Sequence, residues 1–408
     1  MTTNDYIISH RNDDVRQLAL QSAPEGVDLR SALVQISGWQ KATHKLPSWA
    51  TTDGIIFPEH ISMEQCSSEP TAEYKLGIAR RLCSGGGRMI DLTAGFGVDA
   101  TIISRHFKHL TAVERNPQLC QILRNNLPLM GISQNEVVCT DCTEYIDTLT
   151  DVYTPFQLLF IDPARRDAGG RKTVLISDCT PDVGTLLPRL LRMAEVVMIK
   201  LSPMLDTTSV EHDLHGLTEL HIVSVGGECK EVIAIAKQTD DVHDAEVSIH
   251  AVNLSPSVGA REPHTPFIFR RSEESTAAVR YLTLTTSDST PAYLYEPNAS
   301  ILKSGAYRTV ADRYRLLKAS ANSHLYFSDS LAEDFPGRRF RIINAVQPNK
   351  AGIKALASLT RANITTRNYP ISAGDLRRKL RLVDGGDTYI FATTLADNQH
   401  ILFVTEKV

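Results

Sequence analysis

The feature that most constrains this chain is a short apolar segment, residues 88–99, that ends in an acid and continues into a glycine-paired turn. Met89 and Ile90 lead into Asp91, and the turn that follows contains Gly95 and Gly97. Glycine lets the backbone approach a ligand closely, and a helix that begins at such a turn presents unsatisfied N–H groups. The segment therefore predicts a strand, a nucleotide-cofactor loop and a helix.

Three later acids follow three further apolar runs. Glu114 follows Leu110–Val113, Asp141 follows residues 137–140, and Asp162 follows Leu158–Ile161. Strand patterns alternate with helical patterns, which include residues 98–107, 117–130 and 182–193. Such alternation predicts an α/β fold with a parallel sheet, whose ligands bind at the carboxyl ends of the strands. We therefore expect the four acids to line one crevice.

The charge of this crevice indicates the class of cofactor. Asp91 lies four residues before Gly95, where it would repel a pyrophosphate but attract an ammonium or a sulfonium group. The third glycine of a dinucleotide fingerprint is replaced by Ala100, which the looser form of that motif allows. The pattern favours S-adenosylmethionine over a dinucleotide.

Over roughly residues 60–237 the chain resembles the class I S-adenosylmethionine-dependent methyltransferases, which carry D-x-x-x-G-x-G and acids after the second and third strands. The resemblance implies a Rossmann-like seven-stranded sheet that closes with an antiparallel hairpin, here residues 219–236. It also implies the cofactor-binding residues. Asp91, Gly95 and Gly97 are assigned to the methionine portion, Glu114 to the ribose hydroxyls and Asp141 to the adenine amino group. Further cofactor-binding candidates are Thr93, Cys142, Thr71 and Gln65. Two simpler interpretations stay open, because Glu114 could be a solvated strand-end acid and Asp141 a helix N-cap.

The methyl acceptor is expected beside the fourth strand. N-methyltransferases that act on exocyclic amines end this strand in [DN]-P-P-[YF], whereas this chain has Asp162, Pro163, Ala164 and Arg165. Asp162, Pro163 and Arg165 are therefore the predicted catalytic residues, with Arg165 stacking on a base or gripping phosphate. Lys200 and Ser202, after the fifth strand, are predicted substrate contacts. Alternatively, Asp162 and Pro163 only end the strand.

The C-terminal part resembles a bacterial family of methyltransferases that end in a ferredoxin-like segment and a THUMP-like domain. The resemblance rests on residues 295–298, 335–338, 368–370 and 376–389. THUMP domains occur in RNA-modifying enzymes, so structured RNA is the implied partner. Residues 261–408 carry 21 Lys and Arg against 14 Asp and Glu, whereas the whole chain carries 43 against 47. Arg377, Arg378 and Lys379 are the predicted phosphate contacts, although such a cluster can also be a solvated helix face.

Four segments are expected: a helical N-terminal cap (1–60), the methyltransferase domain (61–237), a β-rich linker with the ferredoxin-like segment (238–335), and the THUMP-like α+β domain (336–408). Two helical patterns, residues 15–21 and 29–38, make up the cap. The seven cysteines are scattered, and the Cys139-x-x-Cys142 pair lacks a partner pair, so neither disulfides nor a metal site are expected. No leader or membrane-spanning run is recognised, which predicts a cytoplasmic protein.

The sequence thus predicts an RNA N-methyltransferase. Two alternatives stay open: a methyltransferase of proteins or small molecules, and a non-catalytic protein that binds the cofactor or RNA.

Overall fold

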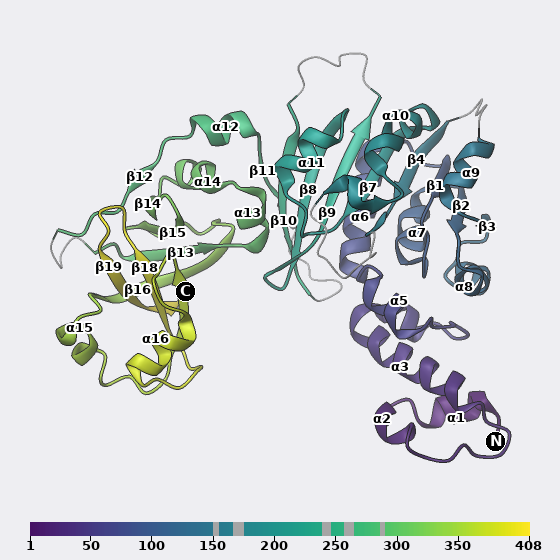
Figure 1. Cartoon of the computed structure of the whole chain (residues 1–408), viewed down its shortest axis with the longest axis horizontal. Coiled ribbons are helices and arrows are strands. Elements are labelled where there is room, and N and C mark those ends of the chain that lie inside the picture. The colour runs from purple at the N-terminus through teal and green to yellow at the C-terminus, as the bar shows by residue number, and fades with distance from the viewer. Residues whose placement is uncertain (150–154, 166–174, 239–245, 257–264, 286–289) are drawn as a thin grey trace. The chain divides into compact units, whose positions relative to one another are not determined.

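The computed structural model describes residues 1–149, 155–165, 175–238, 246–256, 265–285 and 290–408, with Arg165 described by its backbone alone (Figure 1). The chain divides into two compact units. The first unit comprises Met1–Gly226, Lys230–Val247 and Leu254–Pro263, and the second comprises Gly227–Cys229, Ser248–Asn253 and His264–Val408. None of the helices in the described residues combines the length and apolar character that crossing a bilayer requires.

Seven strands of the first unit lie side by side in the order β8-β9-β7-β4-β1-β2-β3. Strands β3, β2, β1, β4 and β7 pair in parallel, and β9 pairs antiparallel with β7. The prediction of a parallel sheet closed by an antiparallel hairpin is confirmed. The strands are β1 (Arg88–Asp91), β2 (His109–Glu114), β3 (Asn135–Cys139), β4 (Phe156–Ile161), β7 (Ala194–Leu201), β8 (Leu217–Val225) and β9 (Glu228–Lys237).

The central strands are buried on both faces, which explains their uninterrupted apolar sequences. Five of the six residues of β4 are buried, and Met89 and Ile90 of β1 are fully buried. The helices that accompany the strands are α6 (Glu69–Leu82), α7 (Val98–Ile103), α8 (Pro117–Leu129), α9 (Cys142–Thr148), α10 (Val183–Met193) and α11 (Thr207–Asp213). The helix predicted over residues 98–107 tightens at its end into a 3₁₀ turn, η1 (Ser104–His106). After β4, a two-residue strand β5 (Ala164–Arg165) pairs with β6 (Cys179–Thr180), which follows the 3₁₀ turn η2 (Ile176–Asp178).

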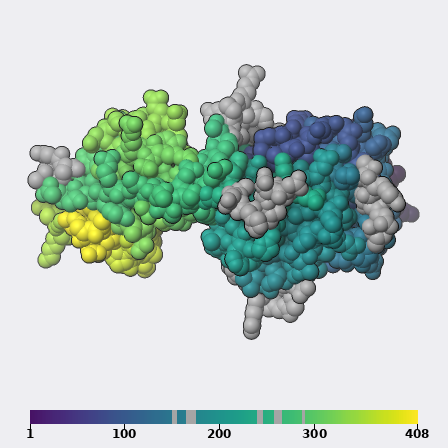
Figure 2. All heavy atoms as spheres, turned by 90° about the horizontal axis from the view of Figure 1, so that it is seen from above, coloured from purple at the N-terminus to yellow at the C-terminus, as the bar shows by residue number. Residues whose placement is uncertain are grey.

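The N-terminal helices pack onto the sheet region and share a core with it. Trp49, Phe57 and Met63 join Leu76 of α6 and Phe96 of the glycine loop in one apolar cluster. In Figure 2 the purple and blue atoms of these early residues lie directly against the teal atoms of the sheet region. The elements are α1 (Thr3–Ser9), α2 (Val15–Leu18), α3 (Leu29–Lys45), α4 (Pro47–Thr51) and α5 (His60–Gln65).

Two of these helices differ in length from the sequence prediction. Helix α2 stops at Leu18, three residues earlier than expected. Helix α3, capped at its start by Asp28, continues through Gly38 to Lys45 and ends before Pro47, which cannot continue a helix.

The second unit is built around an eight-stranded sheet with the order β12-β14-β15-β13-β16-β19-β18-β17. Strands β13 and β16 pair antiparallel, so one sheet runs across residue 336, where the sequence suggested a domain boundary. Strands β10 and β11 pair with each other. The strands are β10 (Ser248–Leu254), β11 (Phe267–Phe269), β12 (Arg280–Tyr281), β13 (Tyr293–Pro297), β14 (Leu317–Ser320), β15 (Ser323–Ser328), β16 (Gly337–Val346), β17 (Asn363–Arg367), β18 (Thr388–Thr394) and β19 (His400–Lys407).

The helices of the second unit are α12 (Arg271–Thr276), α13 (Ala299–Ser304), α14 (Tyr307–Arg313), α15 (Lys350–Ala355) and α16 (Ala373–Leu380). One apolar cluster joins Leu376 of α16 and Leu356, next to α15, to Ile390 of the sheet. The sequence pattern predicts helices over residues 350–359 and 373–380. Helix α15 ends four residues earlier than this prediction, whereas α16 has the predicted bounds.

Candidate functional site

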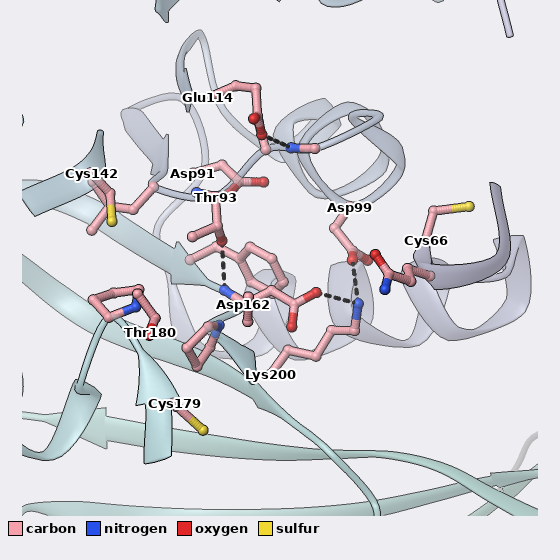
Figure 3. A pocket seen from close by; sticks show the side chains of 18 of the residues that line it. Cys66, Asp91, Thr93, Asp99, Glu114, Cys142, Asp162, Cys179, Thr180 and Lys200 are labelled. Carbon is pink, nitrogen blue, oxygen red and sulfur yellow. Dashed lines mark hydrogen bonds and ion pairs between the residues drawn. The ribbon is translucent and has the colours of Figure 1, made fainter. Parts of the chain in front are cut away.

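A cavity of about 1070 Å³ opens at the carboxyl ends of the parallel strands of the first unit (Figure 3). Its wall contains the predicted residues of the glycine loop and of all four strand ends. The expectation that the acids share one crevice agrees with this arrangement. The predicted residues that line it are Asp91, Thr93, Gly95, Gly97, Glu114, Asp141, Cys142, Asp162, Pro163, Lys200, Ser202 and Gln65.

The glycine loop adopts backbone conformations that side chains disfavour. Gly95 and Gly97 have φ angles of 56° and 89°. A Cβ atom on Gly97 would also lie 2.4 Å from the side chain of Leu123 on α8. Glycine is therefore required at Gly97 for two reasons, the left-handed backbone and the close approach of a helix.

Glu114 braces this loop. One oxygen, Oε2, accepts a hydrogen bond of 2.8 Å from the backbone N–H of Gly95, and the other accepts one of 2.7 Å from the N–H of Asn116. The structure therefore does not match the interpretation of Glu114 as merely a solvated strand-end acid. Each carboxylate oxygen can accept a second bond, so both also remain suited to a pair of ligand hydroxyl groups.

Asp91 is almost completely buried, with 1% of its surface exposed. Its Oδ1 accepts a 2.9 Å bond from the N–H of Thr93, whereas its Oδ2 has no hydrogen-bond partner among the described residues. Burial, together with the nearby Asp99 and Asp162, raises the pKa of Asp91 well above its ordinary value. Such an atom in a cavity wall is suited to a ligand that donates hydrogen bonds and carries positive charge.

Asp141 caps helix α9. Its Oδ1 accepts bonds from the N–H and the hydroxyl of Thr143, at 2.9 and 2.5 Å, and these bonds lower its pKa. The N-cap interpretation of Asp141 is confirmed, and the side chain lines the cavity at the same time. Cys142, the first residue of the helix, is buried, and burial raises the pKa of its thiol to about 11.

Asp162 stands at the end of β4 and is tied to two neighbouring strand ends. Its backbone N–H donates a 2.6 Å bond to the hydroxyl of Thr93, and its Oδ2 accepts a 2.7 Å bond from Lys200 Nζ at the end of β7. Pro163 is buried beside it. The prediction for Arg165 concerns a side chain that lies outside the described residues.

Lys200 belongs to a buried chain of charges that sequence reasoning missed in part. Its ammonium lies 3.5 Å from Asp99 Oδ2, and Asp99 Oδ1 lies 3.0 Å from Lys75 Nζ. Lys75 also contacts both carboxylate oxygens of Glu231, at 2.8 and 2.9 Å. Burial lowers the pKa of Lys200, but Asp162, Asp99 and Glu231 outweigh it and raise the pKa above its ordinary value. Lys200 is therefore a cation.

Two predicted residues differ from the others: Thr71 lies outside the cavity wall, and the hydroxyl of Ser202 already takes part in a hydrogen bond. Thr71 is buried in the first turn of α6, where its hydroxyl donates to the carbonyl of Ser68, and it is not part of the cavity wall. Ser202 lines the cavity, and its hydroxyl accepts a bond from the N–H of Met204.

The predicted basic cluster on α16 is paired with acids on its own surface. Arg377 bonds to Asp384 and Arg378 to Asp375, and Lys379 lies on the same helix. A second basic group on this unit surrounds the buried Glu296 of β13. Its Oε2 accepts a 2.8 Å bond from Arg338 Nε, and its Oε1 accepts a 2.9 Å bond from Arg367.

Comparison with known proteins identifies three family models along the chain. Residues 78–174 match the model of conserved hypothetical protein 95, residues 293–336 a ferredoxin-like domain, and residues 337–407 a THUMP domain-like family. No curated protein is similar enough to count as a match.

Among solved structures, a putative methyltransferase from Porphyromonas gingivalis W83 is 31% identical, with a TM-score of 0.86. The match covers 100% of this chain and 97% of that one. A putative methyltransferase from Streptococcus mutans in complex with SAH is 15% identical over 42% of this chain and 98% of its own, with a TM-score of 0.32. An rRNA methylase from Streptococcus thermophilus is 13% identical over 41% and 95%, with a TM-score of 0.31. Similarities as low as the last two carry no argument about function. The end-to-end match and the three family models, taken with the strand order and the glycine loop, show that this chain belongs to the class I methyltransferase family that ends in ferredoxin-like and THUMP-like domains.

Proposed function

We propose that the protein is an S-adenosylmethionine-dependent enzyme that methylates an exocyclic amine of a base in structured RNA. The observation that carries the proposal is the buried, unpartnered Oδ2 of Asp91 in a cavity wall that also contains Asp162. An enzyme of this class must bind a cationic cofactor beside a group that accepts hydrogen bonds from an amine. Asp91 and Asp162 follow neighbouring strands, β1 and β4, and this placement supports the proposal.

The residues present fit this cofactor by the chemistry of their donors and acceptors. Asp91 would receive the amino group of the methionine portion, Glu114 the ribose hydroxyls, and Asp141 the adenine amine. S-adenosylmethionine supplies an activated methyl group, so the protein needs to hold and orient rather than to activate. The positive φ angles of Gly95 and Gly97 let the backbone approach the ligand closely.

The acceptor side is assigned to Asp162 and Pro163. A carboxylate at this place accepts an N–H of the incoming amine, which turns the nitrogen lone pair toward the cofactor. Thr93 links the backbone of Asp162 to the residue next to the glycine loop, which supports a fixed distance between donor and acceptor sites. The second proline and the aromatic residue of the related motif are absent, so stacking on the base is assigned to another group, for which Arg165 is the candidate.

RNA is favoured as substrate by the second unit. Its THUMP-like segment, residues 337–407, carries 12 Lys and Arg against 5 Asp and Glu. The side chains of Arg338 and Arg367 in this segment are 47% and 41% exposed. Arg378 on α16 is 82% exposed despite its contact with Asp375. Exposed arginines that keep free N–H groups suit phosphate recognition. Cytoplasmic location is part of the same proposal, because cellular RNA is its substrate.

The test is transfer of radiolabelled methyl groups from S-adenosylmethionine by the purified full chain. Total RNA and total protein come from a strain that lacks the gene, and RNA from the parent strain is the control because its target is already methylated. We expect label in one RNA size class, lost on ribonuclease treatment, reduced in parental RNA and absent with Asp162→Ala, which removes the acceptor. Label in protein would instead favour a protein methyltransferase. Absence of label despite cofactor binding would favour a non-catalytic role.

A further inference from the structure

Five charged side chains of alternating sign form a continuous chain inside the first unit. In order they are Glu231, Lys75, Asp99, Lys200 and Asp162, and they come from β9, α6, α7, β7 and β4. Asp162 is the member that the proposed function places at the methyl acceptor. The other end, Glu231, is 3% exposed and also belongs to the cavity wall, and Lys75 beside it has 0% of its surface exposed.

Hydrogen bonds and ion pairs hold the inner members of this chain together. Lys75 Nζ lies 2.8 and 2.9 Å from the two oxygens of Glu231, 3.0 Å from Asp99 Oδ1 and 3.0 Å from Ser67 Oγ. Asp99 Oδ2 in turn accepts a 2.7 Å bond from Ser67 Oγ. Burial opposes ionisation of Asp99, but Lys75 and Lys200 outweigh it and hold the pKa of Asp99 below its ordinary value. Asp99 is therefore an anion with a fixed orientation.

The outer members of the chain, Lys200 and Asp162, lie in the cavity wall. Lys200 has a flexible four-carbon side chain, and an ammonium group alone fixes no direction. Here its Nζ is held between Asp99 Oδ2 at 3.5 Å and Asp162 Oδ2 at 2.7 Å. Among the described residues, Lys200 is the one side chain that hydrogen-bonds to the carboxylate of Asp162. Figure 3 shows the Lys200 ammonium between the two carboxylates.

We propose that Lys200, anchored by Asp99 and Lys75, is a positioning residue that fixes Oδ2 of Asp162 and leaves Oδ1 to accept the N–H of the methyl acceptor. This inference rests on the proposed function. It adds to that function a reason for the orientation of Asp162 in a chain that lacks the second proline and the aromatic residue of the related motif. Buried charges on other elements of the fold then orient Asp162, in place of the residues that follow it in the related motif.

A double-mutant cycle on methyl transfer tests the role of Lys200. Lys200→Met is expected to lower kcat about 100-fold, because a displacement of about 1 Å at a reacting group can cost that much. The KM for RNA and the Kd for S-adenosylmethionine by calorimetry should stay within about threefold. In an Asp162→Asn background, Lys200→Met should change kcat less than twofold, because the group through which Lys200 acts is already altered. Additive losses, or an unchanged kcat in the single variant, would overturn the proposal.

Two further variants keep the test decisive if Lys200→Met does not fold. Asp99→Asn preserves the shape of the link and leaves the pairs Lys75–Glu231 and Lys200–Asp162 intact, and we expect kcat to fall about tenfold with an unchanged cofactor Kd. An unchanged kcat would remove Asp99 from the chain of positioning. Lys41→Met is the matched control, because it replaces an ion-paired lysine outside the cavity wall, and it should leave kcat unaltered.

Crystal structures supply a readout that needs no activity. In the wild type, Lys200 Nζ should lie within hydrogen-bond distance of Asp162, and in Lys200→Met the carboxylate should turn to another rotamer. An unmoved carboxylate would contradict the positioning role. A wild type that binds S-adenosylmethionine but labels no fraction would refute the proposed function, whereas an active wild type with an equally active Lys200→Met would refute the positioning role alone.

Discussion

Each unit of the protein buries a carboxylate between two cations, but the surroundings differ. In the first unit Asp99 lies between Lys75 and Lys200, whose side chains are 0% and 12% exposed. In the second unit Glu296 lies between Arg338 and Arg367, which are almost half exposed. In the first unit the ion pairs continue to Asp162 in a cavity wall, whereas in the second unit the cations face solvent. A buried acid between two cations can therefore serve different roles, because the exposure of the cations decides what they can contact.

The difference in exposure predicts how much free energy of unfolding is lost when each cluster is broken. The largest loss is expected for Lys75→Met. This variant leaves Glu231 and Asp99 short of a partner in the interior, and breaking one side of a buried ion pair costs about 3–5 kcal/mol. Urea unfolding of the full chain measures the loss. Lys41→Met, whose partner Glu64 is exposed, should change stability little, and an equal effect of the two variants would erase the distinction between buried and exposed ion pairs.

Glu114→Ala is expected to weaken binding of S-adenosylmethionine by about 10- to 100-fold, measured by calorimetry. The loss has two causes, because the variant removes an acceptor for ligand hydroxyls and frees the N–H of Gly95 that Glu114 now fixes. Glu136→Ala on the exposed face of β3 is the control. Unchanged affinity for the Glu114 variant would remove that residue from the cofactor site.

Glu296→Gln tests the more exposed cluster. We expect a loss of about 1–2 kcal/mol, less than for Lys75→Met, because Arg338 and Arg367 can be solvated when their carboxylate partner is neutralised. RNA affinity should not fall, since both arginines remain and no longer share an acid. Glu273→Gln, in the surface pair with Arg313, is the control. A larger stability loss than that of Lys75→Met would reverse the comparison.

Asp91→Asn should have the smallest effect on stability and the opposite sign. Burial raises the pKa of Asp91, so the folded state binds the proton more tightly than the unfolded state, and stability falls as the pH rises through the folded pKa. Below about pH 4, the ordinary aspartate range, the variant and the wild type should unfold alike. At pH 8 the cofactor-free variant should be more stable by about 1 kcal/mol, while its cofactor affinity falls. A less stable variant at pH 8 would show that Oδ2 of Asp91 has a partner in the free protein.

Much of this architecture could be predicted from local patterns. The acid at each strand end and the glycine turn are short-range signals, and they placed Asp91, Glu114, Asp141 and Asp162 around one cavity. The lengths of α2 and α3 were less predictable, because capping and the next breaker decide where a helix ends. The core shared by the N-terminal helices and the glycine loop depends on contacts between distant parts of the chain.

The buried charges escaped prediction for a related reason. Lys75 contacts Glu231, which lies 156 residues away, and no local pattern joins them. One signal was available: Lys75 follows Ala72 by three residues and precedes Ala79 by four, so it lies on the apolar face of α6. A lysine on that face requires a buried acid, although the sequence does not say which one.

Glu296 has a consequence for how such a protein can change over evolutionary time. Its carboxylate joins β13, within the ferredoxin-like match, to Arg338 on β16 and Arg367 on β17, within the THUMP-like match. Strands β13 and β16 also share one sheet. The two segments are therefore expected to be inherited together. Loss of the THUMP-like segment would leave Glu296 buried without its cations, and loss of either segment would expose a sheet edge in the half that remained.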